Sequence, residues 1–237
     1  MKKVFRFGSP IMTAILFALA GVMLFGSSIG GASAALTYFS ETYRSQVEMY
    51  DFGITLNENG RSISRRDYRS NSNGQWEEST GVLLEDRWSK RNPLKLGEAY
   101  EEALSVTNSG SIDQYVRVSL YKYWIKDGEK AQDLDPDLIE LHLAGQGNGW
   151  IVDTEASTPE RTVLYYNRIL GVNETSAALT DTLTISSMVS DQAAQYDGAE
   201  FRIEAEADAV QTHNAEDAIW SAWGRRVRIS NGALRLN

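Results

Sequence analysis

YVRVSLYKYWI, residues 115–125, is the stretch that decides the fold class of this chain. Its side chains alternate between two sets, which is the two-residue period of a β-strand. One set consists of Val116, Val118, Leu120, Lys122 and Trp124, and the other of Tyr115, Arg117, Ser119, Tyr121 and Tyr123. We therefore expect a long strand whose first set faces the core, and a turn after it at Asp127 and Gly128.

Similar strand patterns recur on both sides of this stretch, with turn signals about every ten residues. They cover residues 52–56, 81–84, 103–107, 138–143, 150–153, 161–166, 178–186 and 201–207, with a short closing strand at 225–229. Residues 61–74 are rich in Arg, Ser and Asn and lack this period, so we expect a long exposed loop or a hairpin there. The pattern predicts a mainly β protein, an antiparallel β-sandwich or jelly roll, because one sheet alone would leave an apolar face uncovered.

One segment near the C-terminus departs from the strand pattern. Asn214 is a residue type that often caps helices, Glu216 and Asp217 follow in the first turn, and Gly224 is a typical helix end. The apolar side chains have helical spacing and comprise Ile219, Ala222 and Trp223. We expect one short C-terminal helix over residues 214–224.

The first 34 residues have the pattern of a secretory signal peptide. Lys2, Lys3 and Arg6 precede an apolar stretch over residues 11–25, and Ala-Ser-Ala at 32–34 matches a cleavage site. We expect a signal-peptide helix at 1–34, cleavage between Ala34 and Ala35, and a single secreted domain at 35–237, so that only the uncleaved precursor contacts the membrane. A transmembrane anchor over residues 11–36 is the alternative, which the Gly and Ser residues after the apolar stretch disfavour.

Composition excludes several classes of function. The net charge of the 237 residues is -9, which disfavours nucleic-acid binding, because phosphates are bound by Lys and Arg. The chain has no Cys, so disulfides, thiol nucleophiles and Cys-ligated metals are excluded. The two histidines, His142 and His213, do not form an H-E-x-x-H motif, and no nucleophile motif is present. We expect no enzymatic activity and no catalytic residues.

The only candidate metal site is an acidic cluster. Asp133, Asp135 and Asp137 stand at alternate positions, where carboxylates can converge on a hard cation such as Ca²⁺. The EF-hand pattern fails because Leu138 takes the place of the turn glycine and Ala144 that of the bidentate glutamate. A solvated loop is the favoured interpretation, calcium binding remains the alternative, and no other cofactor is expected.

The tyrosine-bearing face of residues 115–125 offers a second candidate surface. Tyr115, Tyr121 and Tyr123 share this face with Arg117 and could bind a carbohydrate or a protein. Ordinary cross-strand packing on a half-exposed sheet explains the same residues, since aromatic side chains are frequent in strands.

Short motifs resemble those of the TasA/camelysin family of secreted biofilm-matrix fibre proteins, which are exported by a SipW-type signal peptidase. The resemblance begins after the signal peptide, with ALTYFSET at 35–42 and YDFGI at 50–54. It continues with PLKLG at 93–97, VTNSG at 106–110 and YVRV at 115–118, and the segment 210–224 is also similar. The Arg-rich residues 61–74 do not match a family hallmark.

The resemblance implies a jelly-roll protein that assembles into extracellular fibres by donor-strand exchange. Segment 35–48 would be the donor, given to a second copy or to a related matrix subunit, and its contacts would involve Leu36, Tyr38, Phe39, Val47 and the adjacent Met49. Two alternatives remain open: a secreted binding module or adhesin for a polysaccharide or protein, and a camelysin-like metallopeptidase. The chain has no metal motif for the peptidase, so that activity is not carried over.

Overall fold

The computed structural model describes residues 51–69, 75–85, 87–89 and 91–237. The expected signal peptide, its cleavage site at Ala34 and Ala35, and the expected donor residues Leu36, Tyr38, Phe39, Val47 and Met49 lie outside the described residues. All the described residues belong to one compact unit. Within the described part, no helix is both long and apolar enough to cross a membrane.

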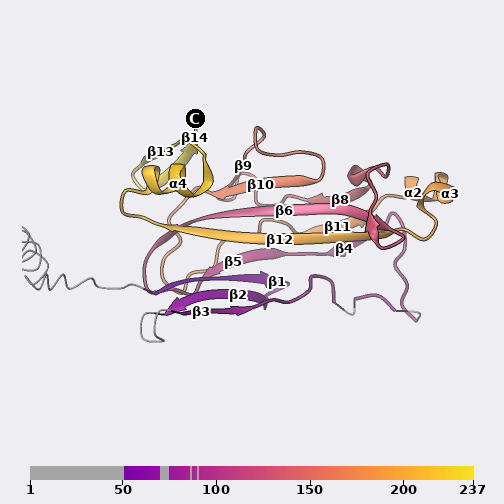
Figure 1. Cartoon of the computed structure of the whole chain (residues 1–237), viewed down its shortest axis with the longest axis horizontal. Helices are drawn as coiled ribbons and strands as arrows, with labels where there is room; N and C mark the ends of the chain where they lie inside the picture. The colour runs from indigo at the N-terminus through magenta and orange to yellow at the C-terminus, as the bar shows by residue number, and fades with distance from the viewer. Residues whose placement is uncertain (1–50, 70–74, 86, 90) are drawn as a thin grey trace, which may run out of the picture. The chain divides into compact units, whose positions relative to one another are not determined.

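The protein is mainly β, and its strands pair antiparallel (Figure 1). The first sheet has the order β3-β2-β1-β5, with bounds Gln75–Ser79, Arg61–Arg69, Phe52–Glu58 and Leu104–Asn108. The second has the order β12-β6-β10-β9, with bounds Glu200–Gln211, Gln114–Lys126, Arg161–Tyr166 and Trp150–Val152, and β7 (Glu129–Lys130) pairs with β6. The third has the order β4-β11-β8, with bounds Ala99–Glu101, Thr182–Ile185 and Ile139–His142.

The remaining elements are a C-terminal hairpin and short helices. The hairpin consists of β13 (Val227–Ser230) and β14 (Ala233–Leu236). The helices are η1 (Pro136–Leu138), α2 (Met188–Asp191), α3 (Ala193–Tyr196) and α4 (Ala215–Trp223). In Figure 1, α4 and this hairpin lie together beside one end of β10 and β6, and α2 and α3 lie at the opposite end of β12.

The main core lies between the first and second sheets. It contains Ile54 and Leu56 from β1, Val106 from β5, and Val118 and Leu120 from β6, all of them buried. Burial of these alternating side chains on facing sheets is the reason that the strand period in the sequence identifies the fold. The expected antiparallel sandwich with one short C-terminal helix is therefore confirmed.

The outer face of β6 is more buried at its N-terminal end than the sequence suggested. Tyr115 is only 2% exposed, and its hydroxyl donates a hydrogen bond to the carbonyl of Gly232, 3.1 Å away. It belongs to a second core formed with Tyr165 beneath Ile219 of α4 and Leu234 of β14. Of the two interpretations of this face, an open binding surface that includes Tyr115 is therefore wrong, because the C-terminal helix and hairpin cover that end of the sheet.

Several boundaries also differ from expectation. Residues 81–84 do not form a strand, and a turn begins at Leu83. The described residues 61–69 form β2, which pairs with β3, in keeping with the second of the two forms expected. Strand β4 and helices α2 and α3 were not predicted. Asn214 precedes α4 as expected, but it has a left-handed backbone with φ 50° and its side chain makes no capping hydrogen bond. Gly224 ends the helix, with its N–H bonded to the carbonyl of Trp220.

Glycine is required at position 53, where β1 passes close to two other segments. A Cβ atom at Gly53 would lie 2.5 Å from Asp67 Oδ1 and 2.7 Å from the carbonyl carbon of Ser109. We expect Gly53→Ala to lower the free energy of unfolding by roughly 1–3 kcal/mol, because backbone must move to make room. Urea unfolding followed by circular dichroism measures the loss of stability. Gly171→Ala is the control, because the atom nearest to a Cβ there, 3.1 Å away, belongs to the flexible Glu174 side chain. Equal losses in both variants would contradict the steric explanation.

Candidate functional site

Strand β12 is the edge of the second sheet and pairs along its whole length with β6 only. Among the described residues, no backbone hydrogen bond joins its other edge to a further strand. A strand edge of 12 residues with unpaired N–H and C=O groups is a template for an added strand. In Figure 1 this free edge faces the first sheet.

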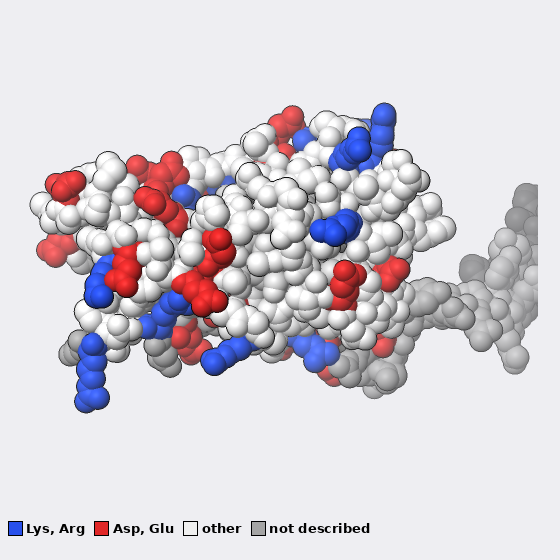
Figure 2. Space-filling view, turned by 180° about the vertical axis from the view of Figure 1, so that it is seen from behind, with Lys and Arg blue, Asp and Glu red and all other residues white. Residues whose placement is uncertain are grey.

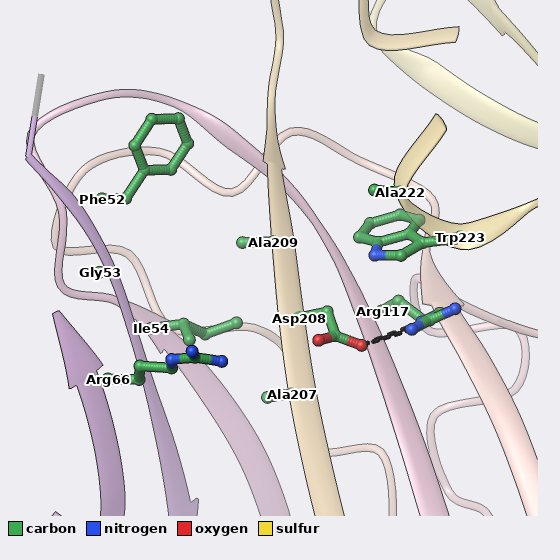
Figure 3. A pocket seen from close by; sticks show the side chains of 10 residues that line it. All are labelled: Phe52, Gly53, Ile54, Arg66, Arg117, Ala207, Asp208, Ala209, Ala222 and Trp223. Atoms are coloured by element: carbon green, nitrogen blue, oxygen red, sulfur yellow. Dashed lines mark hydrogen bonds and ion pairs between the residues drawn. The ribbon is translucent and has the colours of Figure 1, made fainter. Parts of the chain in front are cut away.

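A groove, here called the β1–β12 groove, runs between this edge and the first sheet. Two cavities form it, of about 240 Å³ and about 390 Å³, and they share Ile54, Arg66, Ala207 and Asp208 in their linings. Phe52, the first residue of β1, lines one end, and Thr80 lines the other. Figure 3 shows the first of these cavities, with β12 passing between the side chains of β1 and those of Trp223 and Arg117.

The small side chains of β12 keep this groove open. Ala205, Ala207 and Ala209 are partly buried on the inner face of β12 and pack against the main core. The acidic residues between them, Glu206 and Asp208, are the outer-face partners of β6 side chains. Larger residues at the three alanine positions would fill the space between β12 and β1, so the sequence of β12 leaves room for side chains from another segment.

Ion pairs border the groove on both sides. Arg66 Nε lies 2.7 Å from Glu78 Oε1 on the side of the first sheet, and Arg117 Nη2 lies 2.6 Å from Asp208 Oδ2 on the side of the second (Figure 3). The floor is apolar and contributed by Ile54, Leu56 and the three alanines. An apolar floor with charged borders suits an amphipathic extended segment whose alternate side chains point into the groove.

Two carboxyl groups, of the buried Glu102 and the partly buried Glu58, lie at the end of β1. Glu102 is fully buried, and burial together with the neighbouring Glu58 raises its pKa to about 8. The opposing influence comes from Arg87, whose Nη1 is 3.5 Å from Glu102 Oε2. Glu58 Oε1 accepts a hydrogen bond from the N–H of Leu84 at 2.7 Å, so the pair attaches the segment after β3 to the end of β1.

The expected acidic cluster is dispersed over other contacts. Asp135 Oδ1 caps η1 by accepting from the N–H of Asp137 at 2.9 Å, and Asp137 Oδ1 is 3.1 Å from Lys122 Nζ. The backbone carbonyl of Asp133 accepts from Gln195. Within the described ranges, no three His, Asp or Glu side chains are grouped closely enough to hold a metal ion. In the structure these residues thus form a capped turn, an ion pair and a backbone contact.

The histidines lie apart from each other and from the groove. His142, on β8, is exposed, and its Nδ1 is 2.7 Å from Asp181 Oδ1. This contact lowers the pKa of the Asp181 carboxyl. His213 lies just before α4 and is exposed.

The two remaining tyrosines of the β6 face are each paired with an acid on β12. The hydroxyl of Tyr121 donates to Glu206 at 3.2 Å and that of Tyr123 to Glu204 at 2.7 Å. At these two tyrosines the outer face of the second sheet is thus a polar, hydrogen-bonded surface. On the side of the protein opposite to the view of Figure 1, acidic and basic side chains lie interspersed (Figure 2).

Sequence reasoning identified neither the β1–β12 groove nor the Glu58–Glu102 pair. The alternation of Ala205 and Ala207 with acids was visible within the expected strand at 201–207, and Ala209 continues it beyond that strand, but the closeness of β1 to β12 is a long-range feature. Comparison of the chain with family models, with curated proteins and with solved structures finds no match.

Proposed function

We propose that this chain is a secreted structural protein that assembles into extracellular matrix or biofilm fibres by donor-strand exchange. Segment 35–48, freed by cleavage between Ala34 and Ala35, would occupy the β1–β12 groove of a second copy or of a related matrix subunit. The observation that carries the proposal is the 12-residue edge strand β12, which has no partner on one side among the residues that the structure describes and is bordered there by an open groove.

The dimensions of donor and acceptor agree. At about 3.3 Å per residue, segment 35–48 spans about 46 Å when extended, and β12 spans about 40 Å. Backbone pairing with the edge of β12 would supply affinity, and side chains entering the groove would supply specificity. Leu36 and Tyr38 stand at alternate positions, as do Val47 and Met49, so each pair can point to one side of an extended strand.

Export would act as the switch for assembly. In the precursor, the donor segment is still joined to residues 1–34 and has no free N-terminal end. It therefore cannot enter the groove of a neighbouring copy. Signal peptidase cleavage would release that end outside the cell. The role is structural and requires no catalytic residue and no cofactor.

Two forms of the protein test this function. The chain beginning at Ala35 should form filaments in negative-stain electron microscopy and heterogeneous high-mass species in size-exclusion chromatography. The chain beginning at Met49, which lacks segment 35–48, should remain a folded monomer. Filaments formed by the shorter chain would overturn donor-strand exchange, and a monodisperse monomer from the longer chain under every condition would overturn self-assembly.

A further inference from the structure

A second cavity, here called the arginine cavity, opens on the outer face of the second sheet and has a volume of about 250 Å³. Its floor consists of Ser119 on β6 and Val163 and Tyr165 on β10, which are all nearly fully buried. Trp223 at the end of α4 and Arg225 form one wall. The cavity exists because α4 and the C-terminal hairpin cover only part of this face, and because Ser119 is small.

Three guanidinium groups line the cavity, and one of them has no carboxylate partner in the described part of the chain. Arg117 pairs with Asp208, and Arg225 pairs with Asp153 and Glu155. Arg161 forms no ion pair among the described residues and donates from Nε and Nη2 to the carbonyl of Ala156, at 3.1 Å and 2.6 Å. Its Nη1 group and its positive charge are available to a ligand, and a guanidinium matches a carboxylate geometrically.

A buried acceptor lines the same cavity. Asp153 is 1% exposed, and its Oδ1 accepts from the N–H groups of Glu155 and Ala156. Its Oδ2 is 2.9 Å from Arg225 Nε, and both atoms are buried away from solvent, so Asp153 holds Arg225 at the wall of the cavity. The acceptor that a ligand hydroxyl can reach is the exposed carboxylate of Glu206, which also lines the cavity and accepts from the hydroxyl of Tyr121.

Aromatic rings border the opening. The Arg117 guanidinium lies over the Trp223 ring, 5.1 Å from its centroid, and Trp223 also contacts Tyr165 edge to face. Tyr121 lines the cavity from β6. Rings held in this way offer flat apolar surfaces to the C–H groups of a sugar ring while the polar groups bind its substituents.

We propose that the arginine cavity binds a uronic-acid unit of an acidic polysaccharide. Arg161 would bind the sugar carboxylate and Glu206 would accept a hydrogen bond from a ring hydroxyl. Asp153 and Glu206 both carry negative charge at the cavity, which disfavours a ligand that is only an anion, such as phosphate. A ligand that combines one carboxylate with hydroxyl donors matches both the cation and the acceptor. The proposal goes beyond assembly and does not depend on it.

Ligand-observed NMR titration of the purified protein at constant ionic strength tests the proposal, with glucuronate, glucose and inorganic phosphate as probes. Glucuronate should bind saturably and at least tenfold more tightly than glucose or phosphate. Arg161→Gln should weaken glucuronate binding about tenfold or more, because it removes the unpaired charge. Arg202→Gln is the matched control: Arg202 lies on β12 outside the cavity, pairs with Glu200, and should leave binding unchanged.

A second variant separates loss of the site from loss of the fold. Ser119→Val keeps every charge but fills the floor of the cavity, and it should abolish glucuronate binding while circular dichroism shows a folded protein. Equal binding of glucose and glucuronate, or of phosphate and glucuronate, would overturn the proposal. It would also be overturned if Arg161→Gln and Arg202→Gln had the same effect, or if a folded Ser119→Val variant bound glucuronate normally.

Discussion

Replacing Ala207 with leucine should abolish fibre formation and leave a folded monomer. Ala207 lies at the centre of the β1–β12 groove and lines both of its cavities. A leucine there would occupy the space that the donor side chains need, and it would do so without adding charge or breaking the pairing of β12 with β6. Size-exclusion chromatography and negative-stain microscopy of the variant beginning at Ala35 measure the effect.

The control for this variant is the same substitution outside the groove. Ala194 lies on α3 and is exposed, so Ala194→Leu adds the same apolar bulk to the surface. This control should form fibres as the unmodified chain does. If Ala207→Leu also formed fibres at the normal rate, the β1–β12 groove would not be the site of assembly.

The stability of the protein should fall as the pH rises from about 4.5 to about 8, because of Glu102. The pKa of this carboxyl is raised by burial and by Glu58, from 4.5 to about 8. In that pH window the folded state binds a proton that the unfolded state does not, so the free energy of unfolding declines with pH and levels off above it. The difference corresponds to roughly 5 kcal/mol.

Glu102→Gln should remove most of this pH dependence, because an amide imitates the protonated acid. The variant should be more stable than the unmodified protein at pH 9 and similar to it at pH 5. Glu101→Gln is the control, since Glu101 is the exposed neighbour in the chain and should leave the slope intact. Urea unfolding at five pH values measures the slope, and a flat profile for the unmodified protein between pH 5 and pH 9 would contradict this explanation.

The sequence predicted the central strands well because their two-residue period reflects burial directly. Val116, Val118 and Leu120 alternate with polar residues, and the structure buries all three between the sheets. Residues 61–69 gave no such signal, because β2 is polar on both faces and is positioned by pairing with β1 and β3. The apolar run at 81–84 suggested a strand, but Val82 is 60% exposed and the run pairs with no other strand.

The candidate sites were not predictable because each depends on segments that are distant in sequence. Tyr115 alternates correctly for an outer face, and only the position of α4 and of the hairpin containing Gly232 shows that it is buried. The β1–β12 groove forms only because β1 lies close to β12, about 150 residues further along the chain. Local periodicity in the sequence does not show which distant strands lie close together. Glu102 is likewise indistinguishable from Glu101 until burial is known.

Cysteine cross-linking between two copies tests most directly whether segment 35–48 of one copy occupies the groove of another. The chain contains no Cys, so one cysteine placed in each of two differently tagged copies gives an unambiguous disulfide. One copy would carry Leu36→Cys or Tyr38→Cys, and the other Ala207→Cys or, as control, Ala194→Cys. The two copies are mixed and oxidised under fibre-forming conditions. At least one donor variant should then cross-link to the Ala207→Cys copy and not to the Ala194→Cys copy. Fibres that form without any cross-link to Ala207→Cys, or with equal cross-linking to both acceptor variants, would contradict donor-strand exchange through the β1–β12 groove.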